Sequence, residues 1–193
     1  MADVFVREAR LIDAAGFAAV QRHSWLDSAA ALGLPAPPDA DLMQRSWEKA
    51  VMAPPSDRHH TWVAVETSSD DEVVVGVAAL SPASDPDLDA DVCLELLVFT
   101  VDPPHRSKGH GSRLLTAALQ TASAGGEGEA VVWLASGDDS LRRFLEAAGG
   151  ATDGAHRTLA ADDAELDADG AHELRQVRLG TILKGPELEP GAQ

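Results

Sequence analysis

The segment between residues 101 and 113 combines glycines, prolines and cations in a pattern that suits a phosphate ligand. It reads Val-Asp-Pro-Pro-His-Arg-Ser-Lys-Gly-His-Gly-Ser-Arg and follows an apolar stretch that ends at the prolines. Gly109 and Gly111 then open an amphipathic stretch that is typical of a helix. A turn from strand into helix gathers free backbone N–H groups at the positive end of the helix dipole, and glycines let a ligand approach them closely. The predicted ligand is therefore a phosphate or pyrophosphate group.

The charge of this segment is opposite to that of the chain. Arg106, Lys108 and Arg113 lie within eight positions, although the whole sequence holds only 15 Lys and Arg against 32 Asp and Glu. A net charge of −17 argues against a nucleic-acid partner, because phosphate backbones need a concentrated basic surface. The excess of acids serves solubility, with the attraction of cationic substrates as the alternative.

Two common phosphate motifs do not match this segment. A P-loop places its lysine directly after a glycine, whereas Lys108 precedes Gly109. A dinucleotide fingerprint needs a third glycine and belongs to the first strand–helix unit, whereas this segment lies in the middle of the chain. A glycine-rich turn without any ligand is the structural alternative.

The six residues from Arg106 to Gly111 match Arg/Gln-x-x-Gly-x-Gly/Ala, the acetyl-CoA signature of the GNAT N-acetyltransferases. The chain resembles this family in the strand and Val-Asp-Pro before the motif, in the Leu-Leu after it, and weakly over residues 138–150. The resemblance implies a mixed α/β fold, α+β-like, with a central, mostly antiparallel sheet of about seven strands flanked by about four helices. It also implies acetyl-CoA as co-substrate and an N-acetyltransferase activity on a primary amine.

The resemblance assigns binding roles to particular positions. Backbone amides of the turn would hold the pyrophosphate, and the exposed backbone edge of the preceding strand would pair with the pantetheine arm and the acetyl carbonyl. Asp138 stands where many members carry an asparagine. The residues expected to bind the co-substrate are Phe99, Val101, Arg106, Ser107, Lys108, Gly109, His110, Gly111, Ser112 and Asp138.

Amine attack requires a base, and Glu95 is the candidate. It lies six residues before Val101, an even offset that predicts the same strand face as Leu97, Phe99 and Val101. A glutamate base stands at a similar place in the histone-acetylating branch of the family. The alternative is a half-exposed residue that pairs with a cation of a neighbouring strand.

The general acid of the family has no counterpart, because the chain contains no tyrosine and Leu145 takes its position. Ser136 is the nearest hydroxyl, and the alternative is a thiolate that leaves unaided. A non-catalytic acyl-CoA-binding module with a degenerate active site is the second function that fits the sequence.

Apolar periodicity and Pro or Gly punctuation predict one mixed sheet. A helix from Leu11 would bury Ile12, Ala15, Ala19 and Leu26, and a second, capped by Asp39 or Asp41, would bury Met43, Trp47, Ala50 and Val51. Later helices are predicted over residues 114–122 and 138–148. Strands are predicted over residues 4–9, 61–67, 73–80, 92–101, 130–135, 151–159 and 174–183.

These elements predict a single domain over residues 1–184 with a poorly ordered tail over 185–193 and a mobile loop over 160–170. The single cysteine, Cys93, reads as a buried structural residue and fits a reducing compartment. No signal peptide or membrane-spanning run is visible, so a cytoplasmic protein without a membrane partner is expected. Family members often dimerise, so the resemblance allows a homodimer, but no feature of the sequence fixes the oligomeric state.

The acceptor is expected to be the amine of a small molecule or peptide. Trp25 and Trp47 lie on the two early helices, which border the acceptor site in the family, and are candidates for its wall. His59 and His60 precede a strand and would point to opposite faces. His105, His110, His156 and His172 read as surface or loop residues, and no ligand spacing indicates a metal site.

Overall fold

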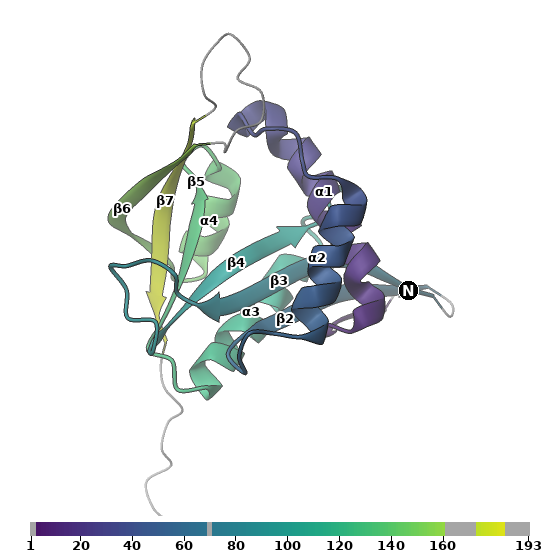
Figure 1. Cartoon of the computed structure of the whole chain (residues 1–193), viewed down its shortest axis with the longest axis horizontal. Coiled ribbons are helices and arrows are strands. Elements are labelled where there is room, and N and C mark those ends of the chain that lie inside the picture. Colours follow the sequence, from purple (N-terminus) through teal and green to yellow (C-terminus); the bar gives the residue numbers. More distant parts are fainter. Residues whose placement is uncertain (1–2, 69–70, 161–172, 184–193) are drawn as a thin grey trace, which may run out of the picture.

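The computed structural model describes residues 3–68, 71–160 and 173–183, in which seven strands form one sheet in the order β1-β2-β3-β4-β5-β7-β6 (Figure 1). The loop expected over residues 160–170, apart from Ala160, and the tail expected over 185–193 lie outside the described residues. The elements are β1 (Asp3–Glu8), α1 (Ala14–Leu32), α2 (Ala40–Met52), β2 (His60–Ser68), β3 (Asp71–Pro82), β4 (Cys93–Val101), α3 (His110–Ala124), β5 (Glu129–Ala135), α4 (Asp139–Ala147), β6 (Ala151–Ala160) and β7 (Glu173–Ile182), with short 3-10 turns at Leu11–Asp13 and Pro103–His105.

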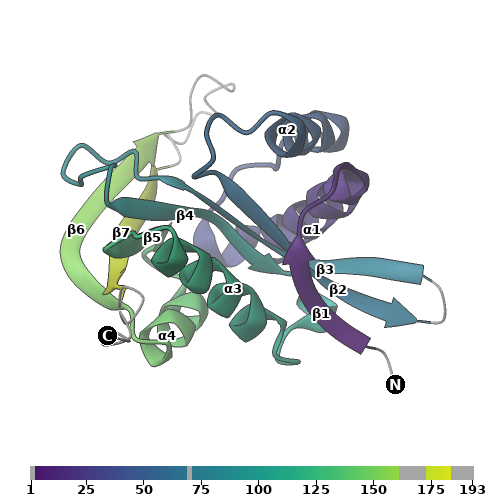
Figure 2. The same ribbon diagram turned by 90° about the horizontal axis from the view of Figure 1, so that it is seen from below.

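The sheet lies between two layers of helices. Helices α1 and α2 cover one face, and α3 and α4 cover the other (Figure 2). Every strand pair is antiparallel except β4 with β5, which is parallel. The predicted fold class is thus confirmed. Among the described residues, no helix is long and apolar enough to cross a membrane.

The central strands are apolar on both sides because each of their faces is covered. In β2, Trp62 and Ala64 pack into the core beneath α3, whereas Val63 and Val65 pack into the core beneath α1 and α2. The strand therefore reads as a continuous apolar run rather than as an alternating one, and its length and β-branched residues identify it as a strand.

Helix α1 turns a different face to the sheet from the one its apolar periodicity predicts. Ile12, in the 3-10 turn before α1, is 84% exposed, Leu26 is 49% exposed, and Ala15 and Ala19 also face solvent. The buried face instead carries Ala14, Phe17, Ala18, Val20 and Ser24. This face also contains polar groups that have partners inside the protein, so side-chain hydrophobicity alone favoured the wrong side.

Helix α2 begins where the sequence predicts. The Asp39 carboxylate accepts hydrogen bonds from the backbone N–H groups of Asp41 and Leu42 at 2.9 and 3.2 Å, which satisfies two of the free donors at the helix start. Met43 and Trp47 are buried as expected, and Trp47 packs edge-on against Phe17. Ala50 is exposed rather than buried because its side of the helix borders a cavity.

Candidate functional site

Strands β4 and β5 separate soon after they meet. Their pairing runs only from Cys93 opposite Glu129 to Glu95 opposite Val131. Beyond that point the two strands diverge, and no described strand pairs with the remainder of β4 on this side (Figure 1). The two strand backbones therefore form a V in the middle of the sheet, and the splay between them is called the wedge, or opening, below.

The free edge of β4 presents backbone groups to this opening. The N–H of Asp102 donates to the carbonyl of Val75 at 2.9 Å, so at this end of β4 the backbone groups of alternate residues bond to β3. The backbone groups of Phe99 and Val101 therefore point the other way, toward the opening. The carbonyl of Val101 accepts from Ser24 Oγ and Arg106 Nε, which leaves the Phe99 groups and the Val101 N–H for a ligand. The binding role of Phe99 and Val101 stays a prediction, and these are the backbone groups that it would use.

The turn after β4 leaves a row of backbone donors without partners. Among the described residues, none of the backbone N–H groups from Ser107 to Ser112 donates to a protein acceptor. Three of them belong to the first turn of α3, where the helix offers no acceptor. Ser107 has φ 61° and Gly109 has φ 86°, and this left-handed backbone turns the chain into the helix. Such a concave row of N–H groups at a helix N-terminus suits an anion.

The Arg106 side chain does not point into this row of donors. Its guanidinium donates to Asp27 Oδ2 at 2.7 Å and to Ser24 Oγ at 2.9 Å, and both partners belong to α1. Thr100 Oγ1 also donates to Ser24, at 2.6 Å. Arg106 thus ties the turn to α1 and positions its backbone. The other two cations of the turn are exposed: Lys108, whose Nζ lies 4.0 Å from Glu66 Oε1, and Arg113.

A β-bulge changes the face that Glu95 occupies. Ala79 pairs with Val98 and Leu80 with Leu96, so Leu97 has no partner on β3. Leu94 and Leu96, the neighbours of Glu95, pack on the α3 side together with Phe99 and Val101. Glu95 therefore points to the opposite face from Phe99 and Val101. The expectation of a shared face is wrong, because the extra residue breaks the period-two alternation.

Glu95 is buried at the end of the β4–β5 pairing. It is 4% exposed, and its Oε2 accepts from the hydroxyl of Ser84 at 3.1 Å and from its backbone N–H at 3.3 Å. Within the described part of the chain it pairs with no cation, in contrast to the alternative role considered from the sequence. The Ser84 contacts offset the cost of burying the carboxylate.

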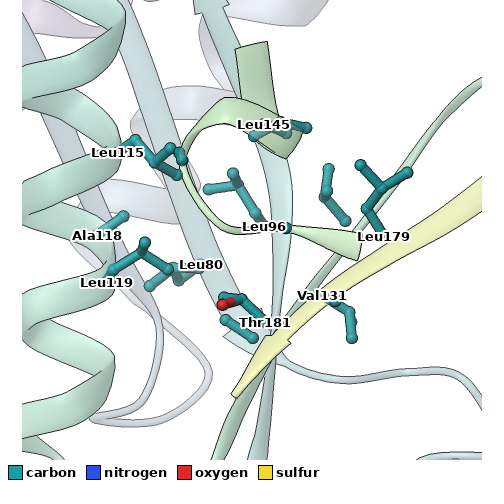
Figure 3. Close-up of a pocket in the computed structure, with 14 residues that line it drawn as sticks. Leu80, Leu96, Leu115, Ala118, Leu119, Val131, Leu145, Leu179 and Thr181 are labelled. Atoms are coloured by element: carbon teal, nitrogen blue, oxygen red, sulfur yellow. The ribbon is translucent and has the colours of Figure 1, made fainter. Parts of the chain in front are cut away.

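Two further predicted residues, Ser136 and Asp138, follow the end of β5. Ser136 is exposed directly after β5, and Asp138 caps α4 by accepting from the N–H of Leu141 at 2.9 Å. Leu145, in the position of the missing tyrosine, points instead into an apolar cavity of about 40 Å³ on the α3–α4 side, where Leu96 and Leu115 also line the wall (Figure 3). Leu145 is therefore a core residue.

A larger cavity of about 440 Å³ lies on the opposite face of the sheet, beneath α1 and α2. Leu97 and Val98, at the bulge of β4, form part of its wall, and Leu80 borders both this cavity and the small one. The two cavities thus flank the sheet where β4 and β5 separate. Trp25 and Trp47, the two tryptophans predicted for the acceptor wall, line the larger cavity.

His59 also lines the larger cavity, a role that the sequence did not predict. Its Nδ1 lies 2.9 Å from Ser56 Oγ, and its Nε2 has no hydrogen-bond partner among the described residues. The alternation of side chains along a strand does not decide where His59 points, because β2 begins one residue later, at His60. One feature of the sequence could have indicated this role. His59 follows closely after Pro54-Pro55, which end the helix that borders the acceptor site in the family.

The structure joins Glu66 of β2 to two histidines beneath the turn. His110 Nε2 lies 2.8 Å from Glu66 Oε1, and His105 Nδ1 lies 3.1 Å from the same oxygen. His110 is 1% exposed, so its assignment as a surface residue is wrong. The three groups offer ligand-type atoms within 4.8 Å of one another, a grouping that ligand spacing in the sequence could not indicate because Glu66 lies far from the histidines in the chain.

These contacts predict a pH-dependent stability. The contact with His105, reinforced by His110, holds the pKa of Glu66 below its usual value. A lowered carboxyl pKa stabilises the fold above the unfolded-state pKa, and this contribution is lost as the pH falls through the folded-state value. We expect Glu66→Gln to lower the free energy of unfolding by about 1 kcal/mol at pH 7 and by much less below about pH 4. Chemical denaturation across pH measures this, and Glu146→Gln, at an exposed glutamate, is the control. A loss independent of pH would contradict the ionic role of Glu66.

The single cysteine does not belong to the site. Burial raises the pKa of the Cys93 thiol to about 11, and the side chain packs with Ala83 and Val131. A thiol of this kind is a poor nucleophile near neutral pH. The reading of Cys93 as a buried structural residue agrees with this environment.

Comparison with known proteins identifies the family. The model of the acetyltransferase (GNAT) family matches residues 22–149. An N-acetyltransferase from Staphylococcus aureus Mu50 shares the fold with a TM-score of 0.68 at 18% identity, over 94% of this chain and 99% of that chain. A GNAT superfamily phosphinothricin acetyltransferase from Sinorhizobium meliloti has a TM-score of 0.68 at 18% identity, over 98% and 94% of the two chains. For a ribosomal-protein-alanine N-acetyltransferase from Brucella melitensis the TM-score is 0.66 at 18% identity, over 93% and 99%.

No curated protein matches the chain in sequence. The structural likenesses establish the shared fold, and the family model, which spans more than half of the chain, establishes the membership. The chain belongs to the GNAT acetyltransferase family.

Proposed function

We propose that this chain transfers the acetyl group of acetyl-CoA to a primary amine by direct attack, with no covalent intermediate on the protein. The observation that carries the proposal is the row of unpartnered N–H groups from Ser107 to Ser112, which lies beside the wedge between β4 and β5. The solved phosphinothricin acetyltransferase from Sinorhizobium meliloti holds acetyl-CoA, and the residues here fit the same co-substrate. The pyrophosphate would meet backbone donors together with Lys108 and Arg113.

The free edge of β4 would position the acetyl group. Phe99 N–H and C=O and Val101 N–H would pair with the pantetheine amides and the thioester carbonyl, as a neighbouring strand would. Acetyl-CoA supplies the activated thioester, and donors aimed at its carbonyl stabilise the negative charge that develops there as the amine attacks. The cavity on the α1–α2 face would hold the acceptor.

His59 is favoured over Glu95 as the base that takes the proton of the attacking amine. His59 lines the acceptor cavity, whereas Glu95 is not among the residues of the cavity wall and is bonded to Ser84. When His59 Nδ1–H donates to Ser56 Oγ, Nε2 is a free acceptor that faces an acceptor amine directly or through one water. Glu95, the base expected from the sequence, is the second candidate. The departing thiolate would take a proton that comes from solvent, either directly or relayed by the Ser136 hydroxyl, which gives up one proton as it accepts another from water.

Two measurements test this function. We expect calorimetry to show acetyl-CoA binding and mass spectrometry to show an amine whose mass rises by one acetyl group as free coenzyme A appears. Binding of acetyl-CoA without acetylation of any amine in a broad panel would support the alternative, a non-catalytic acyl-CoA-binding module. Absence of acetyl-CoA binding would contradict both functions.

A further inference from the structure

We infer that the acceptor is a primary amine carried by an uncharged, apolar body of about one ring system. The inference rests on the proposed acetyl transfer and concerns the chemistry of the larger cavity. That cavity lies against the bulge of β4, so an amine held in it would be next to the wedge in which the thioester is proposed to lie. Its volume of about 440 Å³ is toward the lower end of the range, about 300–1,000 Å³, that small-molecule sites span.

Most of the cavity wall is apolar. The apolar residues come from both early helices, the loop between them, the segment after α2, and strands β3 and β4: Trp25, Pro38, Leu42, Met43, Trp47, Ala50, Pro55, Ala79, Leu80, Leu97 and Val98. Burial of an apolar substrate against such a wall contributes about 25 cal/mol per Å² of apolar surface removed from water. The wall therefore favours a hydrophobic body over a polar one.

The polar groups of the two tryptophans and of Ser46 already have partners. Trp25 Nε1 donates to the carbonyl of Pro35 at 2.7 Å, and Trp47 Nε1 donates to Gln21 Oε1 at 2.9 Å. The Ser46 hydroxyl donates to the carbonyl of Leu42 on its own helix at 2.9 Å. The indoles thus offer the cavity their apolar surface, which suits a ring on the substrate.

The cavity wall carries no formal charge of fixed sign. Among the described residues that line it there is no Asp, Glu, Lys or Arg, and His59 is the titratable one. A polyamine would place a second ammonium group in this cavity without a carboxylate, and an amino acid would place its carboxylate there without a cation. Burying an unpaired charge costs several kcal/mol. The net charge of −17 does not change this, because none of the acids among the described residues belongs to the cavity wall.

The same apolar wall prepares the reacting amine. Desolvation disfavours the ammonium form, so an amine that enters the cavity is bound as the neutral nucleophile that attack requires. A neutral amine needs only one proton acceptor as the new bond forms, and His59 Nε2 provides it. A substrate with a single neutral amine thus needs one proton acceptor, and the described wall residues include one titratable side chain, His59.

Three probe amines separate the substrate classes. 2-Phenylethylamine has an apolar body, L-phenylalanine adds a carboxylate to that body, and 1,4-diaminobutane carries a second ammonium group. We expect kcat/KM for 2-phenylethylamine to exceed those for the other two by at least about 100-fold, the ratio that corresponds to about 2.7 kcal/mol. A higher kcat/KM for either charged probe would overturn the inference and leave the acetyl-transfer proposal intact.

A charge placed on the wall gives a second test. Ser46→Asp puts a carboxylate on a wall residue whose hydroxyl bonds only within α2, and we expect the ratio of kcat/KM for 1,4-diaminobutane over 2-phenylethylamine to rise at least about 10-fold. Ala40→Asp adds the same charge to an exposed position of α2 outside the wall and is expected to leave the ratio unchanged. An equal shift in both variants would show general electrostatic attraction and contradict the inference.

A binding measurement separates this inference from the proposed activity. Because Trp25 and Trp47 line the cavity, 2-phenylethylamine is expected to change the tryptophan fluorescence of the wild-type protein in a saturable manner, and 1,4-diaminobutane is not. Saturable binding without acetylated product would uphold the acceptor class and contradict the transfer. Acetylation without a preference for the apolar probe would uphold the transfer and contradict the acceptor class.

Discussion

Ser112→Glu is expected to weaken acetyl-CoA binding at least about 30-fold without lowering the stability of the fold. Ser112 is exposed in the first turn of α3, and its N–H belongs to the row of donors without protein partners. A carboxylate there would lie a few Å from a bound pyrophosphate, and at an effective dielectric constant of about 20 the repulsion is on the order of 2–4 kcal/mol. A loss of about 2 kcal/mol corresponds to about 30-fold in Kd.

The same substitution is favourable for the helix. A negative side chain in the first turn interacts well with the positive end of the dipole, a stabilisation of about 0.3–1 kcal/mol. Loss of affinity therefore cannot be ascribed to an unfolded α3 if thermal melting shows an unchanged or higher Tm. Gln120→Glu is the matched control, since it adds the same charge on an exposed site of the same helix about 12 Å away. Equal calorimetric affinities for the two variants would exclude the phosphate site.

Most of the element boundaries could be predicted because local chemistry determines them. Asp39 caps α2, Pro103 and Pro104 follow the end of β4, and Gly125 follows the end of α3. Apolar run length and β-branched residues identified the strands even where both faces are buried. Each of these signals acts within a few residues of the boundary that it marks, so no knowledge of the tertiary structure was needed.

The orientation of α1 could not be predicted because it depends on partners in other elements. Its buried side includes Ser24, whose hydroxyl is satisfied by Thr100 and Val101 of β4 and by Arg106 of the following turn. Gln21, on the cavity side, accepts from Trp47 of α2. Polar residues on a buried face look like solvent-exposed residues until their partners are known, and apolar periodicity therefore predicts that the side with Ile12 is buried.

The candidate site likewise has a part that the sequence predicts and a part that depends on contacts between distant elements. The donors of the turn are consecutive in the chain, so a motif of six residues was enough to locate them. The face of Glu95 depends on a bulge in which Leu97 has no partner on β3, and that bulge has no sequence signature of its own. The contact of Glu66 with His110 crosses 44 positions of the chain, and His59 reaches the cavity only through the placement of α1 and α2.

His59→Gln is expected to lower kcat by about 100- to 1,000-fold while leaving the Kd for acetyl-CoA unchanged. General-base catalysis contributes about 10²–10⁴-fold, and a glutamine retains a polar side chain near Ser56 but cannot accept a proton at neutral pH. His59 lines the acceptor cavity on the face opposite α3, so its replacement does not touch the donors that hold the co-substrate. Stopped-flow measurement of acetyl transfer and calorimetry of acetyl-CoA separate the two effects.

The comparison with Glu95→Gln decides which group is the base. Glu95 is buried and accepts from Ser84, and the amide keeps an oxygen acceptor, so we expect a modest loss of stability and a change in kcat of less than about 10-fold. A base role for His59 also predicts that exogenous imidazole restores part of the rate of His59→Ala, where the shortened side chain leaves room beside the cavity. If Glu95→Gln instead reduces kcat 100-fold or more and imidazole has no effect on His59→Ala, then the carboxylate is the base. The proton must in that case reach Glu95 through an intervening group or water, because Glu95 is not part of the cavity wall.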